Sequence, residues 1–170
     1  MDLKSTIRNI PDFPKPGILF RDITTLLKDS AAYRQMVDHI VKSLEGIDVD
    51  IVVGPEARGF VIGSALAYAL GAGFVLARKP GKLPYETIAY EYALEYGKDK
   101  LEIHTDSIKP GQHVVVVDDL LATGGTALAT IRLVEQAGGE VVAARFAIEL
   151  SDLDGRAVLG GYNVDAVIIY

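Results

Sequence analysis

The distribution of apolar and polar residues along the chain predicts strands that alternate with helices. Between Ala31 and Leu44, apolar side chains recur every three or four residues, which indicates an amphipathic helix that ends before Gly46. Val114–Val117 is instead an unbroken run of four valines, typical of a central parallel strand that is buried on both faces. The two periodicities together indicate a mixed α/β chain.

Other segments continue this alternation. The further predicted helices are Leu3–Ile10, Arg58–Leu70, one with Leu128, Ile131 and Val134 on one face that Gly138-Gly139 ends, and a short one opened by a capping box of Ser151 and Asp154. The further predicted strands are Asp50–Val53, Gly73–Ala77, Val141–Ile148 and Val164–Ile169. We therefore expect one α/β domain over residues 1–170, with a Rossmann-like, mainly parallel sheet flanked by helices.

Two segments do not fit either periodicity. Pro11, Pro14, Pro16 and Gly17 make the N-terminal region an ordered surface arm rather than a continuous helix. Residues Arg78–Tyr96 are polar and aromatic, and the pattern leaves open whether they form a loop or a hairpin. Long loops in compact domains are usually functional or disordered, so this segment is a candidate part of a site.

Composition narrows the class of protein. With 49% hydrophobic and 24% charged residues the chain is globular, and its net charge of −6 argues against general binding to nucleic acid. The absence of cysteine excludes disulfides and thiolate chemistry. Residues 1–9 lack the apolar core of a signal peptide, and the longest apolar stretch, 60–76, is glycine-interrupted and too short for a membrane span. We expect a cytoplasmic protein without a membrane or nucleic-acid partner.

The strongest chemical signal follows the valine run. Asp118 and Asp119 stand directly after it, and a loop of small residues from Ala122 to Thr126 leads into a predicted helix. In open α/β sheets, ligands bind beyond the carboxyl ends of the strands. Free backbone N–H groups, hydroxyls and a helix dipole suit a phosphate, and Gly124 and Gly125 allow the backbone to approach it closely. Adjacent carboxylates would accept hydrogen bonds from vicinal hydroxyls, so the pattern predicts a site for ribose 5-phosphate.

Other interpretations of this loop explain less of it. No Lys follows the glycines, which excludes an ATP-binding Walker loop, and the glycine spacing differs from the dinucleotide fingerprint. A purely structural loop, with a capping Asp or Thr and glycines for tight packing, would explain the glycine pair alone. It would not explain the whole string of strand, paired acids, hydroxyls and glycines from Val114 to Thr126.

The string Val114–Thr126 resembles the phosphoribosyl pyrophosphate signature of type I phosphoribosyltransferases. Within that family, four further segments resemble the adenine phosphoribosyltransferases. Gly54–Phe60 is similar to their pyrophosphate-binding loop, and Pro14–Asp22 to their adenine-contacting hood. Arg78–Pro84 and Leu94–Gly97 are similar to their mobile catalytic loop. The resemblance spans nearly the full chain.

The resemblance implies the type I phosphoribosyltransferase fold, with a hood over about 1–30 and a mobile loop over about 78–98. It implies a pentosyltransferase of purine salvage, which joins adenine to phosphoribosyl pyrophosphate and releases AMP and pyrophosphate. Positive charge would build on the sugar as in glycoside chemistry. Members of the family usually form homodimers, so we expect a homodimer.

The resemblance also assigns roles to particular residues. Asp118 and Asp119 would hold the ribose hydroxyls and favour the developing positive charge. The residues implied for the 5′-phosphate are Ala122, Thr123, Gly124, Gly125 and Thr126, and those for pyrophosphate are Arg58, Arg78, Lys79 and Lys82. Lys79 could equally belong to a solvated charged face.

For the base, Leu19 and Phe20 would sandwich the purine while backbone groups of Arg21 contact its edge. Glu95, with Tyr96 beside it, would be the acid or base that assists the purine nitrogen, although Glu95 could also lie on the polar face of a hairpin. Mg²⁺ is expected to bind through the pyrophosphate and the ribose hydroxyls, because the sequence contains no cluster with metal-ligand spacing. The three histidines, His39, His104 and His113, are scattered and are expected to be structural or solvent-facing.

Two other functions stay open at this point. The chain could transfer the phosphoribosyl group to another base, namely hypoxanthine, guanine, xanthine or orotate. It could also be a regulator that senses phosphoribosyl pyrophosphate and binds nucleic acid. The acidic charge and the proline-punctuated N-terminal segment, which is too irregular for a helix-turn-helix, argue against the regulator.

Overall fold

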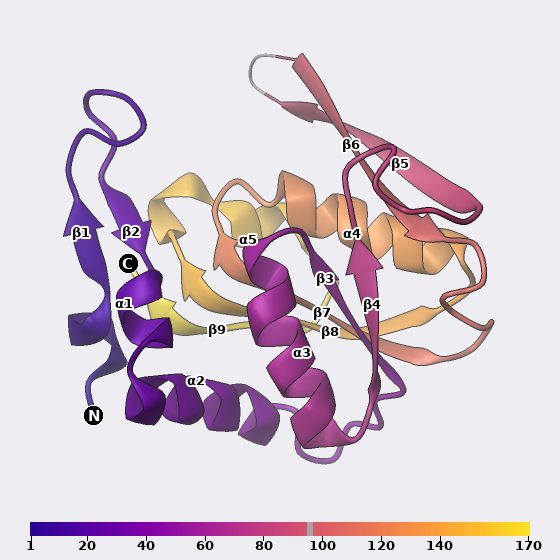
Figure 1. Cartoon of the computed structure of the whole chain (residues 1–170), viewed down its shortest axis with the longest axis horizontal. Coiled ribbons are helices and arrows are strands. Elements are labelled where there is room, and N and C mark those ends of the chain that lie inside the picture. Colours follow the sequence, from indigo (N-terminus) through magenta and orange to yellow (C-terminus); the bar gives the residue numbers. More distant parts are fainter. Residues whose placement is uncertain (95–96) are drawn as a thin grey trace.

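A computed structural model describes residues 1–94 and 97–170 of the protein. Its centre is a parallel sheet of five strands in the order β4-β3-β7-β8-β9 (Figure 1). The strands are β3 (Ile51–Pro55), β4 (Gly73–Ala77), β7 (His113–Leu121), β8 (Glu140–Glu149) and β9 (Val164–Ile169). The predicted fold class, a mainly parallel α/β sheet flanked by helices, is confirmed.

The longer helices cover both faces of this sheet. They are α2 (Ser30–Lys42), α3 (Arg58–Leu70) and α4 (Gly125–Gln136). The valine run of β7 divides between the faces, as expected for alternating side chains. Val115 and Val117 pack into the cluster that contains α2 and α3, whereas Val114 and Val116 pack into the cluster that contains α4. All four valines are fully buried, so β7 anchors the residues that follow it.

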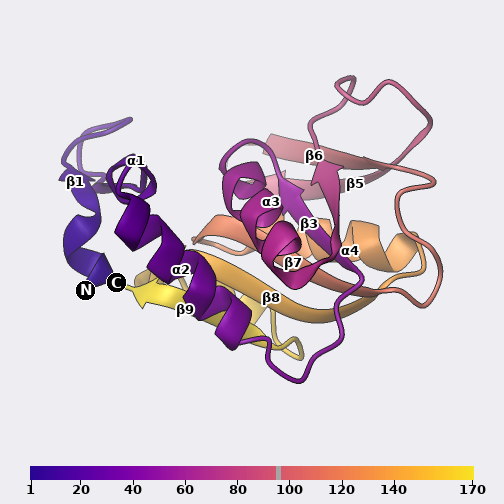
Figure 2. The same ribbon diagram turned by 60° about the horizontal axis from the view of Figure 1, so that its bottom comes forward.

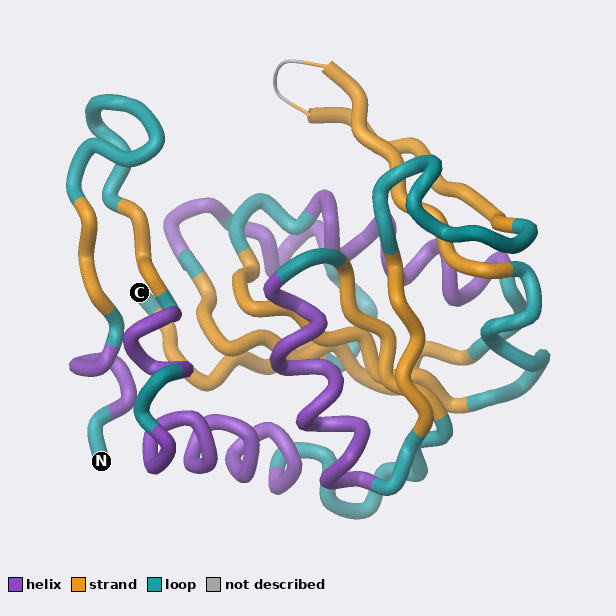
Figure 3. Tube along the Cα trace, viewed as in Figure 1, coloured by secondary structure: helices purple, strands orange, loops and turns teal. Residues whose placement is uncertain are grey.

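Two antiparallel strand pairs lie outside the central sheet. β1 (Arg8–Ile10) pairs with β2 (Phe20–Asp22), and β5 (Thr87–Leu94) pairs with β6 (Gly97–His104). The β5–β6 hairpin packs on α4 through Leu101 and Ile103, which are buried. In Figure 3 the two pairs rise on either side of the sheet edge at which β3 and β4 end.

The described residues also form short helices: the 3₁₀-helices η1 (Leu3–Thr6) and η2 (Ser151–Leu153), and the single turns α1 (Thr24–Leu27) and α5 (Gly155–Val158). The N-terminal segment lies against the C-terminus, where Lys4 Nζ donates to the carbonyl of Ile169 at 2.7 Å (Figure 2). No helix among the described residues combines the length and apolar character needed to cross a membrane.

Several local predictions were wrong or incomplete. The helix predicted over Leu3–Ile10 stops at Thr6, because residues 8–10 form a strand paired with β2. The capping box is absent, since the Ser151 hydroxyl donates to the carbonyl of Tyr170 and Asp154, which precedes α5, makes no side-chain capping bond. The segment left open as loop or hairpin is a loop up to Glu86 followed by a hairpin that extends to His104.

Candidate active site

Of the predicted site residues, Arg58, Asp118, Asp119 and residues 122–126 line a cavity of about 340 Å³ at the carboxyl ends of β3 and β7. Glu56, Ala57 and Arg58 line one side, and residues 118–127 line the other. β3 and β7 are neighbours in the sheet, with Val53 opposite Val116, so the segments that follow them emerge side by side. This is the position at which parallel α/β sheets bind ligands.

The paired carboxylates have different surroundings. Asp118 Oδ1 accepts a hydrogen bond from the backbone N–H of Asp119 at 2.8 Å. Burial, and after it the neighbouring Asp119 carboxylate, raises the pKa of Asp118 well above its usual range. Asp119 Oδ2 instead accepts a hydrogen bond from Nε of Arg58. The pair therefore offers one carboxylate that is hard to ionise and one that already has a cationic partner.

The loop from Ala122 to Thr126 has the geometry of an anion site. Gly124 takes a φ of +87°, a conformation that favours glycine, and α4 begins at the next residue. No side chain caps this helix, and its first residues, Gly125, Thr126 and Ala127, line the cavity. A helix N-terminus with free N–H groups attracts negative charge, which suits a phosphate.

The α5 turn supports this loop from behind. A Cβ atom on Gly155 would lie 2.2 Å from the carbonyl oxygen of Ala122, and a Cβ atom on Gly124 would lie 2.8 Å from the carbonyl oxygen of Gly155. Arg156 anchors the turn, because its Nε donates to Glu149 at 3.0 Å and its Nη1 to the carbonyl of Val164 at 2.7 Å. The loop backbone is therefore in direct contact with a fixed support.

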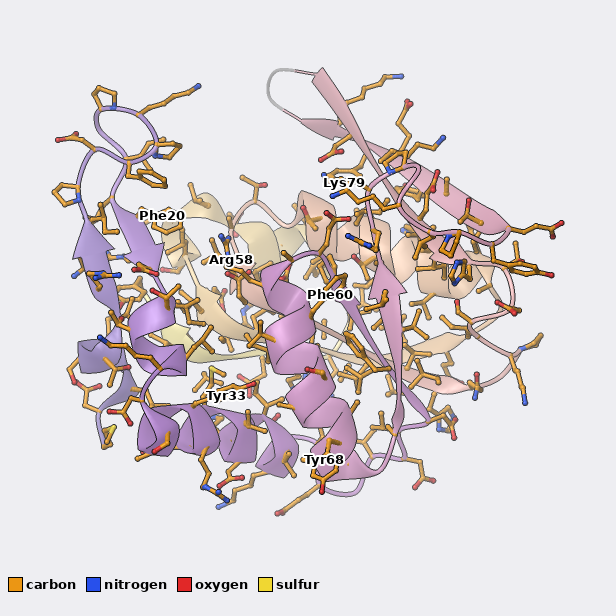
Figure 4. The ribbon with its side chains drawn as sticks, viewed as in Figure 1. Phe20, Tyr33, Arg58, Phe60, Tyr68 and Lys79 are labelled. Carbon is orange, nitrogen blue, oxygen red and sulfur yellow. The ribbon has the colours of Figure 1, made fainter. Side chains whose placement is uncertain are left out.

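Arg58 begins α3 and connects three parts of the site. Its guanidinium bonds Asp119, and its Cζ lies 5.9 Å from the centroid of the Phe20 ring on β2. Figure 4 shows both side chains between the N-terminal arm and the tip of α3. The turn into α3 is tight, since a Cβ atom on Gly59 would lie 2.9 Å from Pro55 Cδ and 3.0 Å from Asp118 Oδ1.

The remaining basic residues of the predicted pyrophosphate site lie on the segment after β4. Arg78 Nε donates to Glu56 Oε1 at 3.3 Å, and Lys82 Nζ donates to Glu56 Oε2. Lys79 Nζ instead pairs with Asp99 on β6. Lys79 is therefore not simply part of a solvated face, because it contributes to an ion pair between the loop and the hairpin.

Sequence reasoning assigned no role to Glu56 or Asp99. Burial acts to raise the pKa of Glu56, but hydrogen bonds from the Lys82 side chain and the Lys79 N–H outweigh it and lower this pKa on balance. Asp99 also accepts a hydrogen bond from Tyr92 at 3.2 Å, and the Tyr92 hydroxyl lies 3.4 Å from Thr126 Oγ1 in the phosphate loop. The position of Glu56 within the string Gly54–Phe60 was the only sequence signal for it.

The segment predicted to contact adenine lies beside a second cavity of about 340 Å³, which Phe13, Phe20, Arg21 and Arg58 help to line. The Phe13 and Phe20 rings pack edge to face with centroids 5.1 Å apart. The Arg21 guanidinium turns to the Tyr170 ring, with its Cζ 3.8 Å from the centroid. Leu19 is 47% exposed and does not line this cavity. The structure thus places Phe20, but not Leu19, next to the rest of the site.

The predicted acid or base and a metal-binding cluster of side chains have no counterpart among the described residues. Glu95 and Tyr96 lie outside the described residues. Among residues 1–94 and 97–170, no three His, Asp or Glu side chains gather as a metal cluster. Asp118 and Asp119 remain a pair of adjacent carboxylates that a hard cation could use together with ligand oxygens.

Comparison with known proteins gives consistent matches. Residues 23–155 match the sequence model of the family described as the phosphoribosyl transferase domain. The chain is 62% identical over 170 residues to an adenine phosphoribosyltransferase of Alkaliphilus metalliredigens, covering 100% of both proteins. The structure matches the crystal structure of adenine phosphoribosyltransferase from Thermoanaerobacter pseudethanolicus with a TM-score of 0.97 and 55% identity, over 99% of this chain and 98% of that one.

A more distant match carries bound ligands. The adenine phosphoribosyltransferase of Saccharomyces cerevisiae, complexed with an imino-altritol bisphosphate and adenine, has a TM-score of 0.92 and 39% identity. The match covers 98% of this chain and 96% of that one. The fold expected from the resemblance is therefore confirmed over nearly the full chain.

Proposed function

This chain belongs to the phosphoribosyl transferase domain family, and we propose that it transfers the phosphoribosyl group of phosphoribosyl pyrophosphate to adenine, forming AMP and pyrophosphate. The observation that carries the proposal is the cavity at the end of β7, where adjacent carboxylates face a helix N-terminus. Full-length identity of 62% to an adenine phosphoribosyltransferase supports the same reaction. The protein is thus a pentosyltransferase of purine salvage.

In the proposed mechanism, the sugar phosphate is held at both ends. Backbone N–H groups and hydroxyls of residues 122–126 bind the 5′-phosphate at the start of α4. Asp118 and Asp119 accept hydrogen bonds from the ribose hydroxyls. As the bond to pyrophosphate breaks, positive charge develops on the ring, and a carboxylate beside it stabilises that charge. The carbon–oxygen bond to pyrophosphate is broken and a carbon–nitrogen bond to adenine is formed.

Arg58, Arg78, Lys79 and Lys82 are proposed to bind the departing pyrophosphate. Arg58 is well placed for this role, because it lines the same cavity as the phosphate loop and carries forked donors. Arg78 and Lys82 do not line the cavity themselves, but both form ion pairs with Glu56, which does. Positioning by these cations would contribute to the rate because it holds the leaving group in line.

Adenine is proposed to bind beside the hood, against the Phe20 ring and the backbone of Arg21. Phe20 supports this position, because its ring lies at the second cavity together with Arg58. Leu19 would have to move from its exposed position to cover the other face of the base. Glu95 is proposed as the group that exchanges a proton with the purine nitrogen, on the basis of the family resemblance alone.

We also propose the cofactor, the oligomeric state and the cellular location. Asp118 and Asp119 fit Mg²⁺, which often binds through one or two carboxylates plus phosphate oxygens and would neutralise charge on pyrophosphate. A homodimer is supported by α3, on which Val61 is 41% and Tyr68 is 91% exposed. Figure 4 shows Tyr68 near the C-terminal end of this helix. The cysteine-free composition is compatible with the cytoplasm, and the net charge of −6 with the absence of a nucleic-acid partner. We treat residues 1–170 as one domain, with a hood over about 1–30 and a loop over about 78–98.

The test is a steady-state assay with phosphoribosyl pyrophosphate, Mg²⁺ and one base at a time. Adenine is expected to give AMP and pyrophosphate, and hypoxanthine, guanine, xanthine and orotate to give little product. If adenine gave no AMP while another base reacted, the proposed substrate would be wrong. A parallel titration with a labelled oligonucleotide at modest salt tests the regulator alternative and is expected to show no binding.

A further inference from the structure

The basic side chains proposed to bind pyrophosphate are already bound to carboxylates of the chain itself. Arg58 pairs with Asp119, Lys79 pairs with Asp99, and both Arg78 and Lys82 pair with Glu56. These carboxylates therefore compete with a phosphate group for the same cations. If the chain has the proposed function, the Glu56 carboxylate bears directly on how pyrophosphate binds.

Glu56 differs from the other two carboxylates in what it does for the site. It lines the cavity itself, two residues before Arg58, whereas Asp99 lies on the hairpin and does not line that cavity. Unlike Asp119, it has no proposed contact with the sugar. Its side chain is 11% exposed and accepts from two cationic side chains and from the backbone N–H of Lys79 at 2.8 Å. Glu56 is therefore an anion built into a site for anions.

The negative charge of Glu56 has two opposing effects on the site. A carboxylate in such a cavity repels pyrophosphate and competes with it for Arg78 and Lys82. The same carboxylate also fixes the segment after β4, because Lys79 N–H donates to Oε1. A glutamine at this position would keep an oxygen acceptor for that N–H while removing the negative charge. This substitution therefore tests the charge of residue 56 separately from its side-chain geometry.

We propose that Glu56 is an internal counterion that competes with pyrophosphate for Arg78 and Lys82. The carboxylate holds the two cations beside the cavity before pyrophosphate is formed. It takes them back as pyrophosphate leaves, which weakens product binding and accelerates release. Glu56 is thus a positioning residue for the product rather than a group that contacts the reacting atoms.

The direct experiment is isothermal titration calorimetry of inorganic pyrophosphate with Mg²⁺ into the full chain and its Glu56→Gln variant at low salt. The variant is expected to bind pyrophosphate about threefold to tenfold more tightly, because two partly exposed ion pairs no longer compete. Raising the ionic strength is expected to reduce the difference, since these charges are partly accessible to solvent. Glu140→Gln removes one equal charge at the start of β8 and serves as the matched control, with unchanged affinity expected.

A kinetic measurement distinguishes this role from a purely structural one. In Glu56→Gln, the inhibition constant of pyrophosphate is expected to fall severalfold, while the KM for adenine stays at the wild-type value. Glu56→Asp keeps the charge and is expected to bind pyrophosphate much as the wild type does. A general disruption of the site would instead weaken pyrophosphate binding in both variants.

Unchanged or weaker pyrophosphate binding by Glu56→Gln, in a variant that unfolds at the wild-type temperature, would overturn the inference. Equal gains in affinity in Glu56→Gln and Glu56→Asp would also overturn it, because charge would then not be the cause. Failure of the proposed function is a separate outcome, which would be seen as a lack of AMP formation by the wild type with adenine.

Discussion

Arg58 and Asp119 are 61 residues apart in the sequence and form an ion pair in the wall of the cavity. The pair joins a residue proposed for pyrophosphate to a residue proposed for the ribose. It forms because β3 and β7 are adjacent parallel strands whose carboxyl ends lie at the same edge of the sheet. The contact therefore depends on the topology of the sheet.

Replacing Asp119 by Asn removes the ion pair and a negative charge beside the proposed ribose site. We expect kcat for AMP formation to fall by about 100-fold, because electrostatic stabilisation of the charge that develops in the transition state is often the main source of an enzyme's rate acceleration. Steady-state kinetics with adenine and phosphoribosyl pyrophosphate measures this effect. A kcat within about twofold of the wild type would reject the role of Asp119 while leaving the fold unaffected.

Gly155 offers a test of the support beneath the phosphate loop. In Gly155→Ala the new Cβ would lie 2.2 Å from the Ala122 carbonyl oxygen, so the loop backbone has to shift. We expect the KM for phosphoribosyl pyrophosphate to rise about tenfold or more, because small displacements of a binding group are costly.

Gly160→Ala is the matched control for this substitution. Its new Cβ would meet only the Ala157 carbonyl oxygen, at 3.2 Å and away from the loop. It is expected to leave the KM within about twofold of the wild type. If the two alanine variants had the same KM, α5 would not position the phosphate loop.

The parts of the site that could be predicted from the sequence are those whose residues are close together along the chain. Asp118, Asp119 and residues 122–126 are contiguous, so one strand, its loop and the next helix could be recognised from local pattern. The predicted bounds of α3 and β4, Arg58–Leu70 and Gly73–Ala77, agree with the structure for the same reason. Small apolar residues and the flanking glycines define both elements locally.

What could not be predicted depends on contacts between distant segments. Residues 8–10 are a strand only because Arg8 pairs with Asp22 and Ile10 with Phe20, and no local pattern specifies that pairing. Likewise, Glu56 gains its role from two cations that follow a different strand. Ion pairs of this kind depend on where loops meet in space, which neither periodicity nor spacing records.

Buried Arg145 on β8 gives a prediction about stability rather than catalysis. Its side chain donates to Ser43 Oγ at 2.8 Å, to the Ser43 carbonyl at 3.1 Å and to the Asn163 carbonyl at 2.7 Å. These bonds tie the end of α2 to the segment before β9. We expect Arg145→Met to lower the free energy of unfolding by about 3 kcal/mol, because several hydrogen bonds from a buried, charged donor are lost.

Urea unfolding of the purified variant measures this change. The exposed Arg132, which pairs with Glu135 on α4, provides the comparison, since a surface ion pair contributes little. Arg132→Met is expected to change the free energy of unfolding by less than about 0.5 kcal/mol. Equal effects of the two substitutions would show that the Arg145 network does not stabilise the fold.

The pKa of Asp22 leads to a prediction of how the stability of the N-terminal arm depends on pH. Hydrogen bonds from the Thr24 side chain and from Arg8 lower the pKa of Asp22 from 3.8 to about 2. Because this pKa is depressed in the folded protein, the stabilisation is fully present above the unfolded pKa and is lost as the pH falls towards 2. We expect a contribution of up to about 2 kcal/mol, less after solvent screening of the exposed Arg8.

The measurement is urea unfolding of the wild type and Asp22→Asn between pH 7 and pH 2. The difference between their free energies of unfolding should be constant above about pH 5 and should shrink below it. A difference that stayed constant down to pH 2 would mean that the Asp22 carboxylate does not stabilise the arm through its charge.

The central claim is that a sugar phosphate binds between the paired carboxylates and the start of α4. A crystal structure of the protein soaked with ribose 5-phosphate tests it most directly. We predict that the phosphate contacts the N–H groups and hydroxyls of residues 123–126 and that the ribose hydroxyls contact Asp118 and Asp119. A phosphate bound at any other place, with these residues free of the sugar, would contradict the account.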